Sequence, residues 1–425
     1  MPMPSYLSPG VYVEEVPSAI KAIAGVSTST AAFIGIVPDA VNLVARNRDF
    51  DPAVATSRPS KLVELTVPTP AKKVMLFTNW SQFTRAFGDL VGDETKPAAA
   101  GTPTVNAGHR NLAHAVYGFF NNGGSRCYVA RVIAEVDVDA VLTAFAAIDE
   151  IALVCAPGML SEAVRDKIVA HCAATADRFA ILDGPEAVTD LTTLTRVAAD
   201  PTPGVMPKRT DLAAWYYPWV KVFDPGTKLQ QPDADGGLNV PPSGHLAGIY
   251  ARVDTERGVF KAPANETVRG ALGVAHSLSR AEQNGLNPKG VNCIRILNDD
   301  VLVWGARTVG GDINADLKYI NVRRTLLFLR ESIDEGLQWA VFEPNTPALW
   351  AKITRNVTAF LTTLWRSGAL FGTTPQEAFF VKCDAETNPP NQRELGQVVT
   401  EIGVSLVRPA EFVIFRVSQF VAAGK

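Results

Sequence analysis

The chain has 425 residues, of which 47% are apolar and 20% are charged, and its formal net charge is -3. This length allows two or three domains, each with its own hydrophobic core, and the composition is that of a globular protein rather than a disordered one. The absence of a basic excess argues against nucleic acid as a partner, because phosphate binding requires concentrated positive charge.

The first residues, MPMPSYLSPG, lack the basic start and the apolar run of a signal peptide. The apolar stretches along the chain are far shorter than the roughly 20 residues that a membrane helix needs. The five cysteines are scattered and show no CxxC spacing, which indicates neither disulfides nor a zinc site. We therefore expect a protein made and assembled in the cytoplasm, without direct membrane insertion.

An extended, Pro-rich arm occupies residues 6–35. Pro4, Pro9 and Pro17 interrupt any helix, since each fixes φ and removes a backbone donor. Between them lie residues that favour a pleated strand, but so short a segment buries too little surface to order itself. The strand-forming residues of this arm are Val11, Tyr12, Val13 and Val16.

The next part of the chain predicts an α/β layer. We expect a buried strand at 30–37, a loop-rich stretch at 38–73, and at 74–90 a strand followed by a helix with Thr78 or Asn79 as N-cap. A helix at 112–120 and a strand at 127–133 follow. The segments at 151–158, 161–177 and 179–185 then read as strand, helix capped by Ser161, and strand, and 213–225 adds another strand. This alternation predicts a partly parallel sheet covered by helices.

From residue 246 the pattern changes. Residues 291–308 predict a β-hairpin turning at 298–300, and 316–337 predicts a long helix. Further helices are expected at 347–370 and 392–402.

The C-terminal segment 411–420 predicts a strand that is apolar on nearly both faces. Such a strand is an aggregation hazard unless it pairs, and pairing with another copy of the chain is one solution. One face carries Val413, Phe415 and Val417, and the other carries Phe412, Ile414 and Phe420.

The sequence contains no GxSxG, phosphate loop, HExxH or GxGxxG motif followed by a helix, so we expect no enzyme activity, cofactor or metal site. Asp183 stands at a predicted strand end, where a carboxylate could line a ligand crevice, but Asp-Gly-Pro is also what a tight turn requires. Trp215, Tyr216, Tyr217 and Trp219 could stack on a sugar or base, although packing is the simpler interpretation.

Four segments, in order, resemble the tail sheath proteins of contractile phages and related injection systems. They are YLSPGVYVEEV at 6–16, STSTAAFIG at 27–35, PPSGHLAGIYARVDTERGVFKAPANE at 241–266 and INVRR...ESIDEGLQWAVFEPN at 320–345. The resemblance implies a helical sheath of stacked rings that contracts from a metastable extended state and drives an inner tube through an envelope.

The same resemblance implies an α/β fold with an α+β core domain, strand-exchanging terminal arms and an outward α/β domain. The implied boundaries are 1–35 for the arm and start of the core, 36–245 for the outer domain, 246–407 for the core lining the tube, and 408–425 for the donor arm. Neighbours would insert their arms at the 291–308 hairpin. The implied partners are further copies, an inner tube protein, and baseplate and terminal cap proteins.

Sheaths of this kind touch the tube through a charged helix, and two helical segments supply candidates. These are Arg323, Arg324 and Arg330 in one, and Arg393 and Glu394 in the other. The mixed charges of 319–345 also fit a solvated helix face. Two other classes stay open: a soluble α/β hydrolase-like enzyme using Asp183, and a scaffold or adhesin module that does not polymerise.

Overall fold

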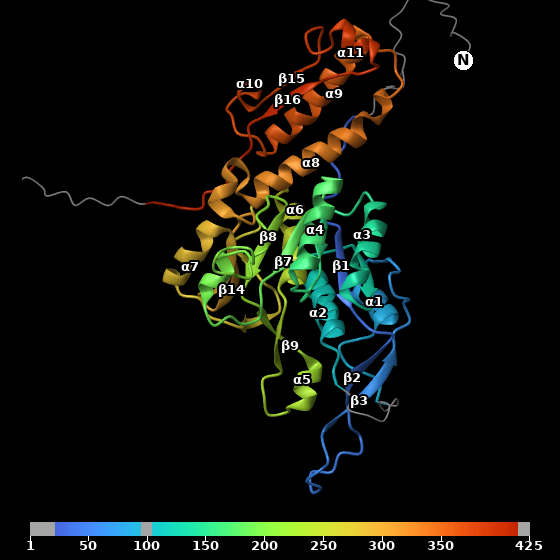
Figure 1. The fold of residues 1–425 in the computed structure, drawn as a ribbon, viewed down its shortest axis with the longest axis vertical. Coiled ribbons are helices and arrows are strands. Elements are labelled where there is room, and N and C mark those ends of the chain that lie inside the picture. The colour runs from blue at the N-terminus through green and yellow to red at the C-terminus, as the bar shows by residue number, and fades with distance from the viewer. Residues whose placement is uncertain (1–21, 95–103, 415–425) are drawn as a thin grey trace, which may run out of the picture.

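The fold is described here from a computed structural model, which covers residues 22–94 and 104–414 (Figure 1). Its centre is a nine-stranded mixed sheet in the order β11-β14-β13-β8-β7-β6-β1-β5-β4. Pairings from β13 through to β5 are parallel, whereas those of β4, β14 and β11 are antiparallel. The strands are β1 Ala31–Ile36, β4 Met75–Phe77, β5 Cys127–Val132, β6 Leu153–Cys155, β7 Phe179–Asp183, β8 Ala213–Tyr217, β11 Glu266–Thr267, β13 Val291–Leu297 and β14 Asp300–Trp304.

The inner strands are short apolar runs because both faces of the sheet are covered. All residues of β7 and β8 are buried, as are all but the last residue of β1. Continuous rather than alternating burial is typical of parallel strands between helix layers. The predicted partly parallel sheet is therefore confirmed.

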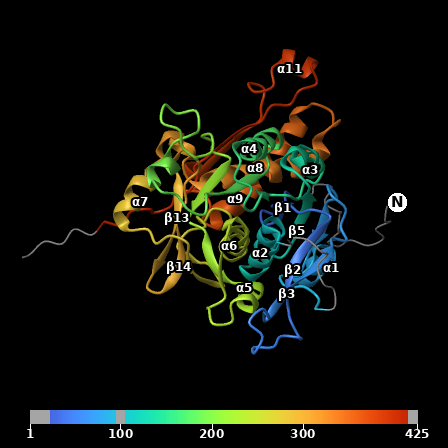
Figure 2. The ribbon, with the colours of Figure 1, turned by 60° about the horizontal axis from the view of Figure 1, so that its bottom comes forward.

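Two pairs of helices cover the two faces of this sheet (Figure 2). On one face α2 (Ala107–Asn121) packs against α6 (Ser243–Glu256), and on the other lie α3 (Val138–Ala146) and α4 (Glu162–Thr175). The contact of α2 with α6 needs a glycine, because a Cβ at Gly244 would lie 2.3 Å from the Ala115 Cα. The N-caps Asn79 of α1 (Trp80–Phe87) and Ser161 of α4 are as predicted.

Smaller sheets extend from the main body. A hairpin of β2 (Ala40–Arg46) and β3 (Ser60–Thr66) occupies the stretch predicted as loop-rich, so that prediction was wrong. A three-stranded sheet contains β9 (Val220–Phe223), β10 (Gly237–Val240) and β12 (Ala271–Val274). Short helices α5 (Pro225–Gln230) and α7 (Arg280–Leu286) complete this part. The short 3₁₀ segments are η1 Glu135–Asp137, η2 Leu191–Thr195, η3 Asn287–Lys289, η4 Gly311–Leu317 and η5 Gln338–Ala340.

A second hydrophobic core lies beyond the long helix α8 (Ile320–Leu337). Helix α8 contributes Leu327 to the main core and Leu329 to the second one, so it joins the two. The second core is built on α9 (Pro347–Arg366) and on the two-stranded sheet of β15 (Phe379–Lys382) and β16 (Glu401–Val404). Helix α10 (Pro375–Ala378) precedes β15. The helix predicted at 392–402 is wrong: only α11 (Pro390–Glu394) is helical there, and β16 follows.

The predicted hairpin at 291–308 is confirmed, with Asn298 and Asp299 both at positive φ, as its two-residue turn requires. The boundary predicted between residues 245 and 246 falls inside α6, and strands from both sides of it share the main sheet. Among the described residues, no helix combines the length and the apolar character required to cross a bilayer.

Candidate functional site

The C-terminal segment leaves the body at Glu411, whose carboxylate is held by three side chains. Arg307 donates to both carboxylate oxygens, at 2.9 and 2.8 Å, Asn287 Nδ2 donates at 2.7 Å, and Tyr319 OH donates at 3.0 Å. Burial raises the pKa of a carboxyl, but the hydrogen bonds from Arg307 and Asn287 outweigh it and lower the pKa of Glu411. Glu411 is thus a fixed point for the chain that follows.

The residues immediately after Glu411 are not covered by any other part of the chain that the structure describes. Phe412, Val413 and Ile414 are 70%, 70% and 79% exposed. The predicted strand over 411–420 does not begin within the described residues, since 411–414 carry no strand. The other predicted donor residues lie outside the described residues: Val11, Tyr12, Val13, Val16, Phe415, Val417 and Phe420.

The N-terminal segment is fixed along α8. Ile23 belongs to the second core and fits against Gly336, where a Cβ would lie 2.7 Å from its side chain. Val26 N donates to Ser332 Oγ at 3.1 Å. At Thr28 the segment reaches α6, because Thr28 Oγ1 donates to Asp254 Oδ2 at 2.6 Å, and β1 begins three residues later. The two ends of the described chain therefore leave on opposite sides of the molecule (Figures 1 and 2).

Arg324 is the centre of this N-terminal anchor. Its guanidinium donates to both oxygens of Asp254, at 2.9 and 2.6 Å, and to the Thr28 carbonyl at 2.9 Å. It also lies 4.8 Å from the centre of the Tyr250 ring. Because Arg324 is buried, it is not available to touch a tube, which corrects the candidate list at this position.

The other charged candidates differ in exposure. Arg323 is partly buried and pairs with Asp211 at 3.1 Å. Arg330 on α8 and Arg393 and Glu394 on α11 are exposed. Of the five candidates, one is therefore buried, one is partly buried and three are exposed. The positions of these residues in the sequence do not reveal this difference.

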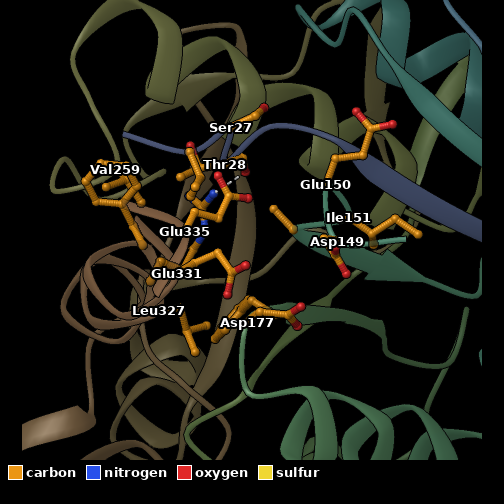
Figure 3. Close-up of a pocket in the computed structure, with 15 residues that line it drawn as sticks. Ser27, Thr28, Asp149, Glu150, Ile151, Asp177, Val259, Leu327, Glu331 and Glu335 are labelled. Atoms are coloured by element: carbon orange, nitrogen blue, oxygen red, sulfur yellow. Dashed lines mark hydrogen bonds between the residues drawn. The ribbon is translucent and has the colours of Figure 1, made fainter. Parts of the chain in front are cut away.

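A pocket of about 110 Å³ beside the N-terminal segment is lined by carboxylates from three parts of the chain (Figure 3). Glu331 and Glu335 come from α8, Asp149 and Glu150 precede β6, and Asp177 precedes β7. Burial, followed by the negative charges of its neighbours, raises the pKa of Glu331. No group of three or more potential metal ligands is arranged for an ion within the described ranges.

Asp183 is a structural residue. Its carboxylate accepts hydrogen bonds from Ser243 N and Ser243 Oγ, both at 2.8 Å, and from Gly158 N at 3.2 Å. Both oxygens are therefore used to hold the start of α6 against the sheet. Burial raises the pKa of Asp183 to about 6 despite these donors.

The predicted crevice for a hydrolase thus has its carboxylate already engaged, and Trp215, Tyr216, Tyr217 and Trp219 are all buried. Three of the histidines have partners within the fold, and a fourth is buried. His114 pairs with Asp224 at 2.9 Å, His109 Nε2 lies 2.8 Å from the Phe87 carbonyl, and His171 Nε2 lies 3.3 Å from Arg178 Nη1. His245 is buried between α2 and α6, and its Nδ1 has no hydrogen-bond partner among the described residues.

Among the features that sequence reasoning missed is the open sheet of β15 and β16. Among the described residues β15 has a strand partner only on its β16 side. By contrast, the outer edge of β14 is occupied by its own chain, since Asn265 N and Val268 N donate to the carbonyls of Val303 and Val301. Two short strands separated by a long loop give no hairpin signal, so the sequence pattern could not reveal this sheet.

Comparison with known proteins agrees with these features. The family described as the phage tail sheath protein central domain matches residues 133–309, and the phage tail sheath C-terminal domain matches residues 312–420. The tail sheath protein of Burkholderia phage BcepMu is 28% identical over 203 residues, which is 46% of this chain and 40% of that protein. The tail sheath protein of Escherichia phage P2 is 26% identical over 175 residues, 40% of this chain and 42% of that protein.

The matched regions span half or less of the length of these curated relatives. Solved structures match over almost the whole chain. The baseplate of the anti-feeding prophage contains a chain with TM-score 0.68 and 28% identity, covering 98% of this chain and 100% of that one. The helical sheath of the same particle in its contracted state gives a TM-score of 0.67 at 27% identity, with the same coverage. From these matches, the chain belongs to the contractile tail sheath family.

Proposed function

We propose that this chain is the structural subunit of a contractile sheath, which polymerises helically around an inner tube and contracts to drive the tube through a target envelope. The observation that carries the proposal is the likeness to the anti-feeding prophage helical sheath over 98% of this chain. The particle is a phage tail or a contractile injection system, with an inner tube, a baseplate and a terminal cap as further partners. No enzyme activity and no cofactor is part of this function.

The two anchored ends support a mesh of linked copies. Ile23 and Val26 fix the start of the described chain along α8, and Glu411 anchors the C-terminal segment, which leaves the body on the opposite side (Figure 1). Arms that continue from opposite sides reach two different neighbours. Each inserted strand forms several backbone hydrogen bonds, worth about 1 kcal/mol each, together with apolar burial. Links of that strength hold while subunits rotate.

We revise the receiving sheet from the hairpin of β13 and β14 to the sheet of β15 and β16. An incoming strand needs an edge with free backbone groups. The edge of β14 is covered by residues 265–268, whereas β15 has no strand on its outer side among the described residues. Phe380 on β15 is 58% exposed, and an added strand would bury part of this ring.

Contraction in this proposal is a passage between two packings of the same subunits. The free energy that drives contraction is stored when the sheath assembles in its extended state, as in other bistable interfaces. Contraction therefore requires no nucleotide. Arg330, Arg393 and Glu394 are the candidates for holding the extended state against the tube, because they are exposed. Individual surface ion pairs are weak, but a helical array repeats each of them many times.

Negative-stain electron microscopy of the purified full-length chain, alone and coexpressed with its inner tube, tests the proposal. We expect hollow cylinders of uniform width with helical striations in at least one preparation. Small discrete particles in both preparations would contradict a sheath function and favour a scaffold or adhesin role.

A further inference from the structure

Phe342 is the most exposed large apolar side chain of the described residues, at 104% relative accessibility. It lies just beyond α8 and η5, in the loop that leads to α9. A single exposed apolar side chain is common on protein surfaces, but complete exposure of a phenyl ring is not. The backbone of Phe342 is unusual as well, because its φ is positive.

The ring is held outward by a strained turn. Glu343 N donates to the Ala340 carbonyl at 3.2 Å, Val341 has φ -67° and ψ 131°, and Phe342 has φ 67°. These values define a type II turn, in which the residue at the Phe342 position is ordinarily glycine. A bulky side chain in the left-handed region is an outlier that the fold itself does not require.

Three other exposed apolar residues lie on the same loop or on the loop to which it is hydrogen-bonded, and we call Val341, Phe342, Leu395 and Val398 together the Phe342 patch. Their exposed fractions are 63%, 104%, 73% and 36%. Two hydrogen bonds fix the loops that carry them: Asn345 Nδ2 donates to the Gln397 carbonyl at 2.9 Å, and Trp350 Nε1 donates to Asn345 Oδ1 at 2.8 Å. The patch is therefore preorganised, as contact residues at interfaces are.

A second copy of this chain is the partner that the surroundings favour. The described chain begins beside the C-terminal end of α8, where Ile23 packs on Gly336, and the patch follows the same end of that helix. In the proposed mesh the N-terminal arm links this copy to a neighbour, and the root of that arm lies beside the patch. The exposed charges around the patch, Glu343, Arg393 and Glu394, have both signs, so a like surface on a second copy is not repelled. In this inference Arg393 and Glu394 face that copy, and Arg330 is the candidate that is left for the tube.

We propose that the Phe342 patch is a contact between copies of this chain, in which a neighbouring subunit buries the Phe342 ring. This inference rests on the proposed sheath function and adds an interface separate from the strand-exchanging arms. It explains both observations together, because a strained turn that presents an apolar ring to solvent destabilises the monomer and is useful only when the ring is covered.

Three substitutions in the full-length chain test the role of the ring. Phe342→Gly removes the ring and relieves the turn, so the thermal midpoint of the monomer should rise by about one or two degrees. The critical concentration for sheath assembly, measured by sedimentation and microscopy, should rise about tenfold or more. Phe342→Ala should weaken assembly similarly without the gain in stability, and Phe342→Tyr should restore assembly.

Val136→Asn is the matched control, because Val136 is 76% exposed and lies on η1, far along the chain from the patch. Its assembly should equal that of the unmodified chain. Unchanged assembly of Phe342→Gly would overturn the proposal. If Val136→Asn weakened assembly as much as Phe342→Gly does, the proposal would also be overturned, because loss of any exposed apolar residue would then have this effect.

Photocross-linking identifies the partner. Phe342 is replaced by p-benzoylphenylalanine, and particles from cells that make the complete assembly are irradiated. A covalent dimer of this chain supports the proposal. An adduct with the tube subunit, or no adduct, overturns it. If the unmodified chain forms no sheath in any preparation, the proposed sheath function is wrong. If it forms sheaths but the Phe342 variants assemble normally, only the patch proposal is wrong.

Discussion

Asp183 is a buried carboxyl that opposes folding at neutral pH. Burial raises its pKa to about 6, above the usual 3.8, so the native state binds more protons than the unfolded state between these values. Its contribution to stability is therefore present below about pH 4 and is lost as the pH rises through 6. The carboxylate is nevertheless retained because it holds the N-terminus of α6.

Asp183→Asn should remove this pH dependence. The amide can still accept from Ser243 N and donate to Ser243 Oγ, but it loses the bond from Gly158 N. Between pH 4 and pH 7 the native chain should lose up to about 3 kcal/mol of its free energy of unfolding, and Asp183→Asn should not show this loss. Urea unfolding at several pH values measures this, with Asp233→Asn on an exposed loop as control. Parallel pH curves for Asp183→Asn and the native chain would contradict the assignment.

Arg324 and Asp254 form the buried pair that ties the N-terminal segment to α6 and α8. Removing one partner leaves a buried charge, so Asp254→Ala should lower the free energy of unfolding by about 3–5 kcal/mol. The double substitution Asp254→Leu with Arg324→Met should lower the free energy of unfolding by less than the sum of the losses caused by Asp254→Leu alone and Arg324→Met alone. A double-mutant cycle by urea denaturation checks this coupling, and additive effects would show that the two charges act independently.

At the scale of elements, the sequence predicted those whose signals are local. Asn79 and Ser161 cap their helices, and Asn298 and Asp299 form the hairpin turn, because each of these signals depends on a few adjacent residues. The strand pair of β2 and β3 was missed, since its segment is broken by several prolines and the strands pair across a long loop. Helix α6 was also missed, because it is buried almost all round and shows no amphipathic pattern.

The same limit applies to the candidate site. The charged residues of α8 look alike in sequence, yet Arg324 is buried against Asp254 whereas Arg330 is exposed. Only the tertiary packing of the N-terminal segment and α6 decides this. The anchor at Glu411 joins residues from three separate parts of the chain, so no spacing in the sequence could indicate it.

Glu411→Gln should loosen the root of the C-terminal arm without unfolding the protein. Arg307 keeps its contacts with Asp312, at 3.0 Å, and with the Asn287 carbonyl, at 3.3 Å, so its charge stays partly compensated. Loss of charge-assisted hydrogen bonds worth about 1.5–3 kcal/mol should raise amide exchange about tenfold or more in residues 405–414. Hydrogen exchange with mass spectrometry measures this.

Glu386→Gln is the control for this experiment, since Glu386 forms only an exposed ion pair with Lys382. The lowered pKa of Glu411 adds a second readout: the anchor is intact above its ordinary pKa and is lost as the pH falls through the lowered value. Exchange that is equally slow in Glu411→Gln and the native chain would show that the anchor lies elsewhere.

At the scale of the whole molecule, two hydrophobic cores share α8 and the N-terminal segment. Ile23 lies in the second core, whereas Thr30 and the strand after it lie in the main sheet, so one short stretch of chain bridges both. In the proposed mesh, this joint places the root of the N-terminal arm against both cores. The domain division at 36–245 and 246–407 remains a prediction.

Deleting Met1 to Val16 should separate folding from assembly. The anchors that hold the described body, from Ile23 to Thr28, remain in the shortened chain, so its circular dichroism and thermal midpoint should match those of the full-length protein. Long contraction-competent sheaths should be absent, because the strand that we propose to link one copy to the next is missing. Replacing Phe412 and Phe415 by Asp should act in the same way from the other arm. Full-length cylinders around the inner tube from either variant, seen by electron microscopy, would show that strand exchange is not what connects the copies and would leave surface contacts to carry the whole assembly.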